Sequence, residues 1–184
     1  RMMLGDFDGD GVPEILYYGG MPNSPSTNMA WHRLALGGYT PATNRIRSTT
    51  DGLGTVHRVQ YDVLTNDDVY QIQNTAAYPL LTLRAPLPVA RRIETMAGND
   101  TLWSEYSYKD AVLHWQGKGL LGFRERSVSA SSGTTSVIRN GINTEYYVPY
   151  KTSERVYASD GTLWKTDTLF TFFDAKGPKR YFMH

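Results

Sequence analysis

The sequence predicts a mainly β fold of antiparallel sheets joined by hairpins, arranged as a curved sheet or a sandwich. Its 184 residues include 13 Tyr, 6 Phe and 4 Trp, side chains that favour strands. The 17 Gly and 9 Pro are spread along the chain, where they mark frequent turns. No window of about a dozen residues has the 3.6-residue periodicity of an amphipathic helix. Short strands separated by turns are therefore expected throughout.

Alternating segments and turn dipeptides predict individual strands and hairpins. Val59, Tyr61 and Val63 alternate with polar residues, as in a strand with one apolar face. A later strand is expected to present one face formed by Trp164, Thr166, Thr168, Phe170 and Phe172. Dipeptides that favour tight hairpin turns stand at Asp51-Gly52, Asn140-Gly141 and Asp160-Gly161.

Three other segments predict connections. Residues 19–30 are rich in Gly, Pro, Ser and Asn, a composition typical of a linker or surface loop. Residues 76–88 contain three prolines and are expected to form an extended, irregular crossing. Residues 129–136 read SASSGTTS, which favours a hairpin tip. The chain ends carry no start or stop signature, so we expect a piece of a longer polypeptide.

Charge and cysteine content exclude several classes of function. The chain has 19 Lys and Arg against 18 Asp and Glu, a formal net charge of +1. This balance gives no electrostatic basis for binding nucleic acid or an anionic membrane surface. The absence of cysteine excludes disulfides, thiolate metal sites and cysteine nucleophiles. No apolar run approaches the roughly 20 residues that a membrane-spanning helix needs.

The strongest motif is the acidic segment LGDFDGDGVPEILYY at residues 4–18. Calcium takes six to eight oxygen ligands at about 2.3–2.6 Å, and alternating carboxylates in a tight loop converge on one point. The spacing predicts a calcium loop whose ligands are Asp6, Asp8, Asp10, the Val12 carbonyl and Glu14. The alternative is an acidic turn that holds no metal.

The same segment is not an EF-hand. An EF-hand requires a bidentate Glu at position 12 of the loop, and here that position is Tyr17. The residues after Glu14 also favour a strand over a helix. The motif DFDGDGVPEIL instead resembles the repeat signature of FG-GAP/VCBS β-propeller blades, whose loops bind calcium. This resemblance implies a structural Ca²⁺ ion.

A second resemblance covers residues 44–128. DGLG at 51–54 precedes a strand, the proline-rich crossing follows, and YSYKDAVLHWQGKGLLGF at 106–123 comes last. This order resembles the SpvB-type middle region of bacterial Rhs/YD-repeat proteins and of the B component of insecticidal toxin complexes. There the region joins an FG-GAP propeller to a hollow YD-repeat shell around a C-terminal cargo. The resemblance implies residues 1–30 as propeller end and linker and 31–184 as the β-rich middle domain.

The residues of this region also have a physical interpretation. Tyr106 and Tyr108 share one face of a strand, as do Val112 and His114 in the next run. Gly117, Gly119 and Gly122 favour a bulged bend, and Leu120, Leu121 and Phe123 are expected to fill the space inside it. We therefore expect a curved sheet.

No catalytic constellation stands out, so a non-enzyme is expected. His32, His57, His114 and His184 have no partner at metal-ligand or catalytic spacing, and His114 is expected to be half-buried and hydrogen-bonded. There is no Gly-x-Ser-x-Gly elbow and no phosphate-binding loop. The sequence leaves open whether Glu94, Glu105 and Glu125 lie together as a glycosidase would need.

Two functions remain as expectations. The resemblance implies a structural segment of a secreted or cell-surface toxin-like protein, with its own further domains and a toxin-complex subunit as partners. The rival is a carbohydrate- or protein-binding domain on a bacterial surface, because Trp31, Trp103, Trp115 and Trp164 could form a stacking platform. A row of solvent-facing aromatic side chains beside polar groups would favour the binding domain, and buried aromatic side chains on a curved sheet would favour the structural segment.

Overall fold

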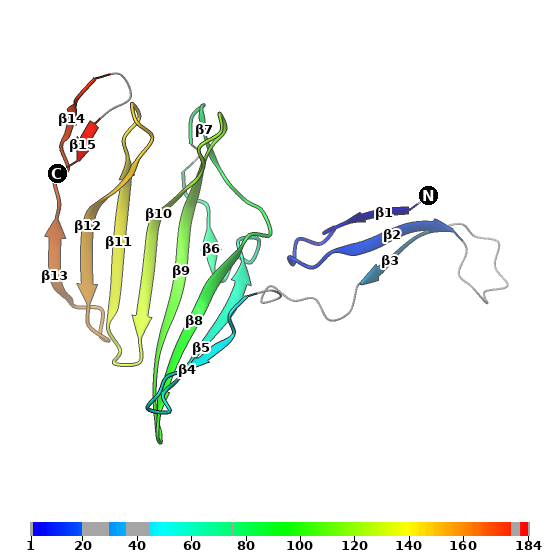
Figure 1. Cartoon of the computed structure of the whole chain (residues 1–184), viewed down its shortest axis with the longest axis horizontal. Coiled ribbons are helices and arrows are strands. Elements are labelled where there is room, and N and C mark those ends of the chain that lie inside the picture. The colour runs from blue at the N-terminus through cyan, green and yellow to red at the C-terminus, as the bar shows by residue number, and fades with distance from the viewer. Residues whose placement is uncertain (1, 20–29, 36–44, 75, 178–180, 184) are drawn as a thin grey trace.

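The computed structural model describes residues 2–19, 30–35, 45–74, 76–177 and 181–183. The described residues contain no helix, and their strands form three sheets with antiparallel pairing almost throughout (Figure 1). The predicted mainly β fold is confirmed. No helix in the described part of the chain is long and apolar enough to cross a membrane.

A small sheet holds the N-terminal strands β1 (Met2–Gly5), β2 (Glu14–Gly19) and β3 (Ala30–Ala35), with β2 in the centre. The acidic loop connects β1 to β2. The domain boundary expected between residues 30 and 31 falls at the start of β3, which pairs with β2 from Glu14 to Gly19. Of the expected linker 19–30, residues 20–29 lie outside the described residues.

The large sheet is one continuous, open sheet with β13 and β4 at its edges (Figure 1). Of the two architectures that the sequence left open, this strand order corresponds to the open sheet. Its main strands, in spatial order, are β13 (Leu163–Thr168), β12 (Pro149–Tyr157), β11 (Thr135–Ile142), β10 (Gly119–Ala130), β9 (Asp100–His114), β8 (Pro88–Ala97), β5 (Val56–Val63) and β4 (Ser48–Thr50). A separate hairpin joins β14 (Phe173–Ala175) to β15 (Tyr181–Met183).

The strand β9 has three different neighbours along one edge. Strand β8 pairs with β9 only from Asp100 to Glu105. The short strand β6 (Tyr70–Gln71) then pairs with it in parallel at Tyr108 and Lys109. Strand β7 (Leu80–Thr82) completes the edge at residues 112–114. The crossing predicted at 76–88 thus contains a strand, because the edge of β9 needs hydrogen-bond partners there.

The hydrophobic core is small and lies where this inserted segment meets β9. Its buried members are Leu64, Val69, Tyr70, Tyr108 and Ala111. Partly buried side chains pack around them from both sides of the contact, namely Leu83, Leu87, Val89, Tyr106 and Phe123. Tyr106 and Tyr108 both join this core, as expected for residues on one face of a strand.

Two buried tyrosines tie the inserted segment to the sheet. The Tyr70 hydroxyl donates to the Leu83 carbonyl at 2.7 Å and accepts from the Ala111 amide at 3.0 Å. The Tyr108 hydroxyl donates to the Ala90 carbonyl at 2.7 Å. Burial raises the pKa of Tyr70, and burial raises the pKa of Tyr108 to about 12. Both hydroxyls therefore remain protonated hydrogen-bond donors at neutral pH.

Two of the three predicted hairpin turns are confirmed, and the third is wrong. Asp51-Gly52 lies between β4 and β5, and Asp160-Gly161 lies between β12 and β13. Asn140-Gly141 lies inside β11 instead, beside a register shift between Arg139 and Asn140. A Cβ atom at Gly141 would stand 2.7 Å from Tyr150 Cζ. The glycine there serves the close approach of a neighbouring ring, a role that a dipeptide pattern does not distinguish from a turn.

Two further expectations are corrected. Strand β13 ends at Thr168, where its pairing with Ser153 of β12 also ends, so Phe170 and Phe172 do not belong to it. Leu120, predicted to fill the space inside the bend, is exposed. It lies next to the register shift between Leu120 and Gly122, whereas Phe123 packs against the Tyr108 ring at 4.5 Å between centroids.

The double role of the Tyr70 hydroxyl gives a first prediction. Tyr70→Phe removes both hydrogen bonds and leaves the buried Ala111 amide without a partner, so we expect the free energy of unfolding to fall by about 1–3 kcal/mol. Tyr78→Phe is the matched control, because Tyr78 is exposed and, among the described residues, its hydroxyl bonds only to the Gln116 side chain. Urea denaturation measures both; an equal effect of the two substitutions would contradict the role of Tyr70.

Candidate functional site

The acidic loop brings four carboxylates together between β1 and β2. Oxygens of Asp6, Asp8, Asp10 and Glu14 all lie within 4.8 Å of one another. Asp6 follows β1 directly, and Glu14 is the first residue of β2, where its side chain is only 1% exposed. The two strands pair from Gly5 and Glu14 outward, which holds the ends of the loop side by side.

Backbone amides organise this loop around its acids. The Asp6 carboxylate accepts from the amides of Gly9 at 2.7 Å and Gly11 at 2.9 Å. Glu14 Oε2 accepts from the Phe7 amide at 2.8 Å. Gly9 and Gly11 have φ of 78° and 83°, in the left-handed region that glycine adopts readily. The two glycines thus let the backbone wrap around Asp6.

The remaining loop residues continue this arrangement. The Asp10 amide donates to Asp8 Oδ1 at 3.3 Å, and the Val12 amide donates to Asp10 Oδ1 at 2.8 Å. Four carboxylates this close repel one another unless a cation or protons neutralise them. The donor set consists of hard oxygen atoms, which suits calcium and not a soft transition metal.

The acidic loop also contacts the large sheet, and no sequence motif predicts this contact. The Thr65 hydroxyl donates to the Gly9 carbonyl. A Cβ atom at Gly11 would lie 2.8 Å from Val63 Cγ1. A cavity of about 270 Å³ separates the two parts, lined by Asp8, Gly9, Asp10, Asp62, Val63, Thr65 and Asn66. The loop therefore joins the small sheet to the corner that follows β5.

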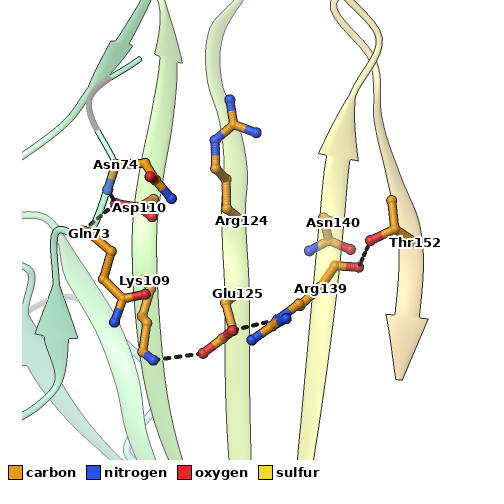
Figure 2. Close-up of a pocket in the computed structure, with 9 residues that line it drawn as sticks. All are labelled: Gln73, Asn74, Lys109, Asp110, Arg124, Glu125, Arg139, Asn140 and Thr152. Carbon is orange, nitrogen blue, oxygen red and sulfur yellow. Dashed lines mark hydrogen bonds and ion pairs between the residues drawn. The ribbon is translucent and has the colours of Figure 1, made fainter. Parts of the chain in front are cut away.

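A second polar site lies on the large sheet and draws residues from five segments (Figure 2). We call this cavity of about 370 Å³ the polar pocket. It is lined by Gln73, Asn74, Lys109, Asp110, Arg124, Glu125, Arg139, Asn140 and Thr152. Glu125 and Asn140 were singled out from the sequence in other contexts, and Lys109 and Asp110 belong to the segment 106–123.

A row of ion pairs across three strands forms one side of the polar pocket (Figure 2). Glu125 of β10 bonds to Lys109 Nζ of β9 and to Arg139 Nε of β11, both at 2.8 Å. Its side chain is 12% exposed. Burial alone would raise the pKa of Glu125, but the hydrogen bonds from Lys109 and Arg139 outweigh it and lower the pKa. The carboxylate is therefore ionised at neutral pH.

The opposite wall is fixed by Asp110. Its Oδ1 accepts from the amides of Gln73 at 2.8 Å and Asn74 at 3.0 Å, which anchors the segment after β6 to β9. Asp110 is buried and has a φ of 50°, an uncommon conformation for a residue other than glycine. This backbone turn interrupts the regular alternation of β9, because the buried Ala111 then follows on the core side.

Each carboxylate considered for catalysis has a cationic neighbour. Glu94 pairs with Arg92, Glu105 lies 4.0 Å from Arg91, and Glu125 bonds to Lys109 and Arg139. His114 is 5% exposed, and neither ring nitrogen has a hydrogen-bond partner. The expectation of a half-buried, hydrogen-bonded His114 is therefore wrong: its ring packs against Tyr147 at 4.2 Å between centroids. His184 lies outside the described residues.

Comparisons with family models, with curated proteins and with solved structures find no match for this chain. Its function is therefore inferred from the residues and their geometry.

The ion pairs of Glu125 predict a pH dependence of stability. Because the folded protein lowers the pKa of Glu125, the contribution of this carboxylate is present above about 4.3, the usual pKa of Glu. It is lost as the pH falls through the lower pKa of the folded state. We expect Glu125→Gln to cost about 1 kcal/mol at pH 7 and to flatten the acid limb of the stability curve. Asp68 is exposed and has no ion pair in the described chain, so Asp68→Asn should change neither the stability at pH 7 nor its acid limb. An equal loss of stability in the two variants would contradict the role of Glu125.

Proposed function

We propose that this chain is a non-catalytic structural β-scaffold segment of an exported protein of the Rhs/YD-repeat type. In this proposal it helps to form the wall of a shell around a C-terminal cargo. Its partners are the remaining domains of the same polypeptide and a toxin-complex subunit, and its location is extracellular or at the cell surface. The observation that carries the proposal is the amount of apolar side chain that the open sheet leaves uncovered.

The uncovered apolar groups lie largely at the ends and edge of the large sheet. Trp164 on the edge strand β13 is 66% exposed, and Phe170 just after it is 78% exposed. Other exposed apolar side chains of this sheet and its turns are Leu53, Leu102, Trp115, Leu120, Leu163, Leu169 and Phe172. Exposed apolar groups mark sites where further protein covers the surface, and an exposed edge strand offers hydrogen bonds to another strand. A segment of a larger wall accounts for both features.

Calcium has a structural role in this proposal. The carboxylates of Asp6, Asp8, Asp10 and Glu14 and the carbonyl of Val12 would hold the ion between β1 and β2. The ion would neutralise the four acids, and the loop would then keep the contact between Gly9 and Thr65.

The alternative, a carbohydrate- or protein-binding surface, is favoured by a different group of side chains. Tyr78 and Trp115 are exposed, and the Gln116 amide donates to the Tyr78 hydroxyl at 2.8 Å. These residues flank the contact between β7 and the end of β9, away from Trp164 on β13 (Figure 1). The exposure of Trp115 and Trp164 favours this alternative. These two tryptophans do not form the single row that a stacking platform needs, and Tyr70 and Tyr108 are buried on the sheet, so the scaffold is our preferred proposal.

Calcium binding predicts a stabilisation that can be measured directly. Adding millimolar Ca²⁺ to the protein should raise its melting temperature, because an ion that binds only the folded state stabilises it by RT ln(1 + [L]/Kd). At a free concentration about 100 times Kd the gain would be about 2.7 kcal/mol. Asp8→Asn and Asp10→Asn together should abolish the shift, and Mg²⁺ at equal concentration controls for ionic strength. An unchanged melting temperature in a folded sample would overturn the calcium proposal.

The scaffold proposal is tested on the natural polypeptide that contains this chain. Electron microscopy should reveal a hollow particle, and limited proteolysis should leave its C-terminal segment intact while exposed loops are cut. A solid or extended particle with a protease-sensitive C-terminal segment would overturn the scaffold and favour the binding-domain alternative.

A further inference from the structure

We propose that the polar pocket binds an acidic sugar of the uronic-acid type, whose carboxylate is held by Arg124. This inference goes beyond the scaffold proposal and does not depend on it. Arg124 is half-buried on β10 and extends into the pocket away from Glu125 (Figure 2). It is the charged side chain of this pocket that contacts no partner in the described part of the chain.

Every other charged group of the polar pocket is already satisfied. Lys109 and Arg139 share the Glu125 carboxylate, and Asp110 accepts two backbone amides. Three cations and two carboxylates line the site, so the surplus is the positive charge of Arg124. A guanidinium group presents a planar fork of donors that matches a carboxylate in a bidentate pair. One monovalent, planar anion would therefore balance the charge of the pocket.

The walls around Arg124 are fixed before a ligand arrives. The Asn140 side chain donates to the Phe123 carbonyl at 2.9 Å, which leaves its own oxygen available as an acceptor. The Thr152 hydroxyl donates to the Arg139 carbonyl at 3.0 Å. Asp110 accepts from the backbone amides of Gln73 and Asn74, which also line the pocket. A site built this way loses little conformational entropy on binding.

The size and polarity of the pocket select a sugar. Its volume of about 370 Å³ lies toward the lower end of ligand pockets, which span about 300–1,000 Å³, and exceeds the needs of a simple carboxylate ion. The lining consists of amides, a hydroxyl and charged groups, so a peptide side chain with a long apolar stem would find no complementary surface. Hydroxyl groups around a ring both donate and accept, as the amides of Gln73, Asn74 and Asn140 require.

Isothermal titration calorimetry with galacturonate tests this assignment, with galactose as the neutral analogue and acetate as the anion without a ring. A galacturonate trimer added in a second arm distinguishes a chain-binding site from one that takes the free monosaccharide. We expect galacturonate or its trimer to bind and galactose to bind at least about tenfold more weakly, because galactose lacks the charged hydrogen bond to Arg124. Acetate keeps that bond but has no ring hydroxyls to bond the amides of the pocket, so it should also bind at least about tenfold more weakly. Arg124→Gln should weaken the acidic ligand by about 10- to 100-fold, and Arg124→Lys should retain part of the affinity.

Arg126→Gln provides the matched control on the same strand. Arg126 pairs with Tyr108, whose ring packs against Phe123, so Arg126 lies on the core side of β10. Glu125, which pairs with Lys109 and Arg139, lies on the side of the pocket, as Arg124 does. This variant should bind like the unmodified protein. Because Arg124 has no partner to lose, melting temperatures of the Arg124 variants should match that of the control.

Several results would overturn the proposal. Equal affinity for acetate and galacturonate would show that the pocket binds any carboxylate and would exclude specific recognition of a sugar. Unchanged binding in Arg124→Gln would place the ligand elsewhere on the molecule. No heat of binding from either acidic ligand at about 10 mM, where a millimolar complex would be saturated, would exclude the pocket as a uronate site. None of these outcomes bears on the particle shape that tests the scaffold.

Discussion

The strand β9 must find hydrogen-bond partners along its whole length, and this constraint organises the large sheet. Strand β8 leaves β9 after Glu105, which would expose the remaining backbone amides and carbonyls of a 15-residue strand. These groups are paired by β6 and β7, two short strands from the segment between β5 and β8. The same segment delivers Leu64, Val69 and Tyr70 to the face of the sheet. The same segment therefore provides both the backbone pairing of β9 and part of the hydrophobic core.

The large sheet has irregularities close to that insertion, and Asp110 and Asn140 beside them line the polar pocket. Asp110 turns the backbone of β9 where the neighbour changes from β6 to β7. Register shifts then occur in the adjoining strands, between Leu120 and Gly122 and between Arg139 and Asn140. Bulges redirect side chains within a sheet. Arg124 and Glu125, consecutive in β10, both line the pocket beside the irregular residue Asp110, an arrangement that strict alternation would forbid.

Carboxylates occur in three different arrangements in this chain. Asp110 accepts backbone amides, and Glu125 accepts two cationic side chains. In the acidic loop, backbone amides donate hydrogen bonds to Asp6 and Glu14, yet oxygens of four carboxylates lie within 4.8 Å of one another. The first two arrangements bring donors to a single carboxylate, whereas the third keeps four acidic groups close together, where their mutual repulsion favours a cation. This difference is why a cation is proposed for the loop and an anion for the polar pocket.

The sequence by itself determined the β class, the side on which Tyr106 and Tyr108 lie, the turns at Asp51-Gly52 and Asp160-Gly161, and the grouping of acids between β1 and β2. Each of these depends on residues close together in the chain, where periodicity and turn chemistry act locally. Only the tertiary structure decided that Asn140-Gly141 lies within a strand, that β6 and β7 fill the edge of β9, and that Lys109, Glu125 and Arg139 form a row. The physical reason is register: a shift of one residue turns a side chain to the other face, and register is fixed by pairing between distant strands.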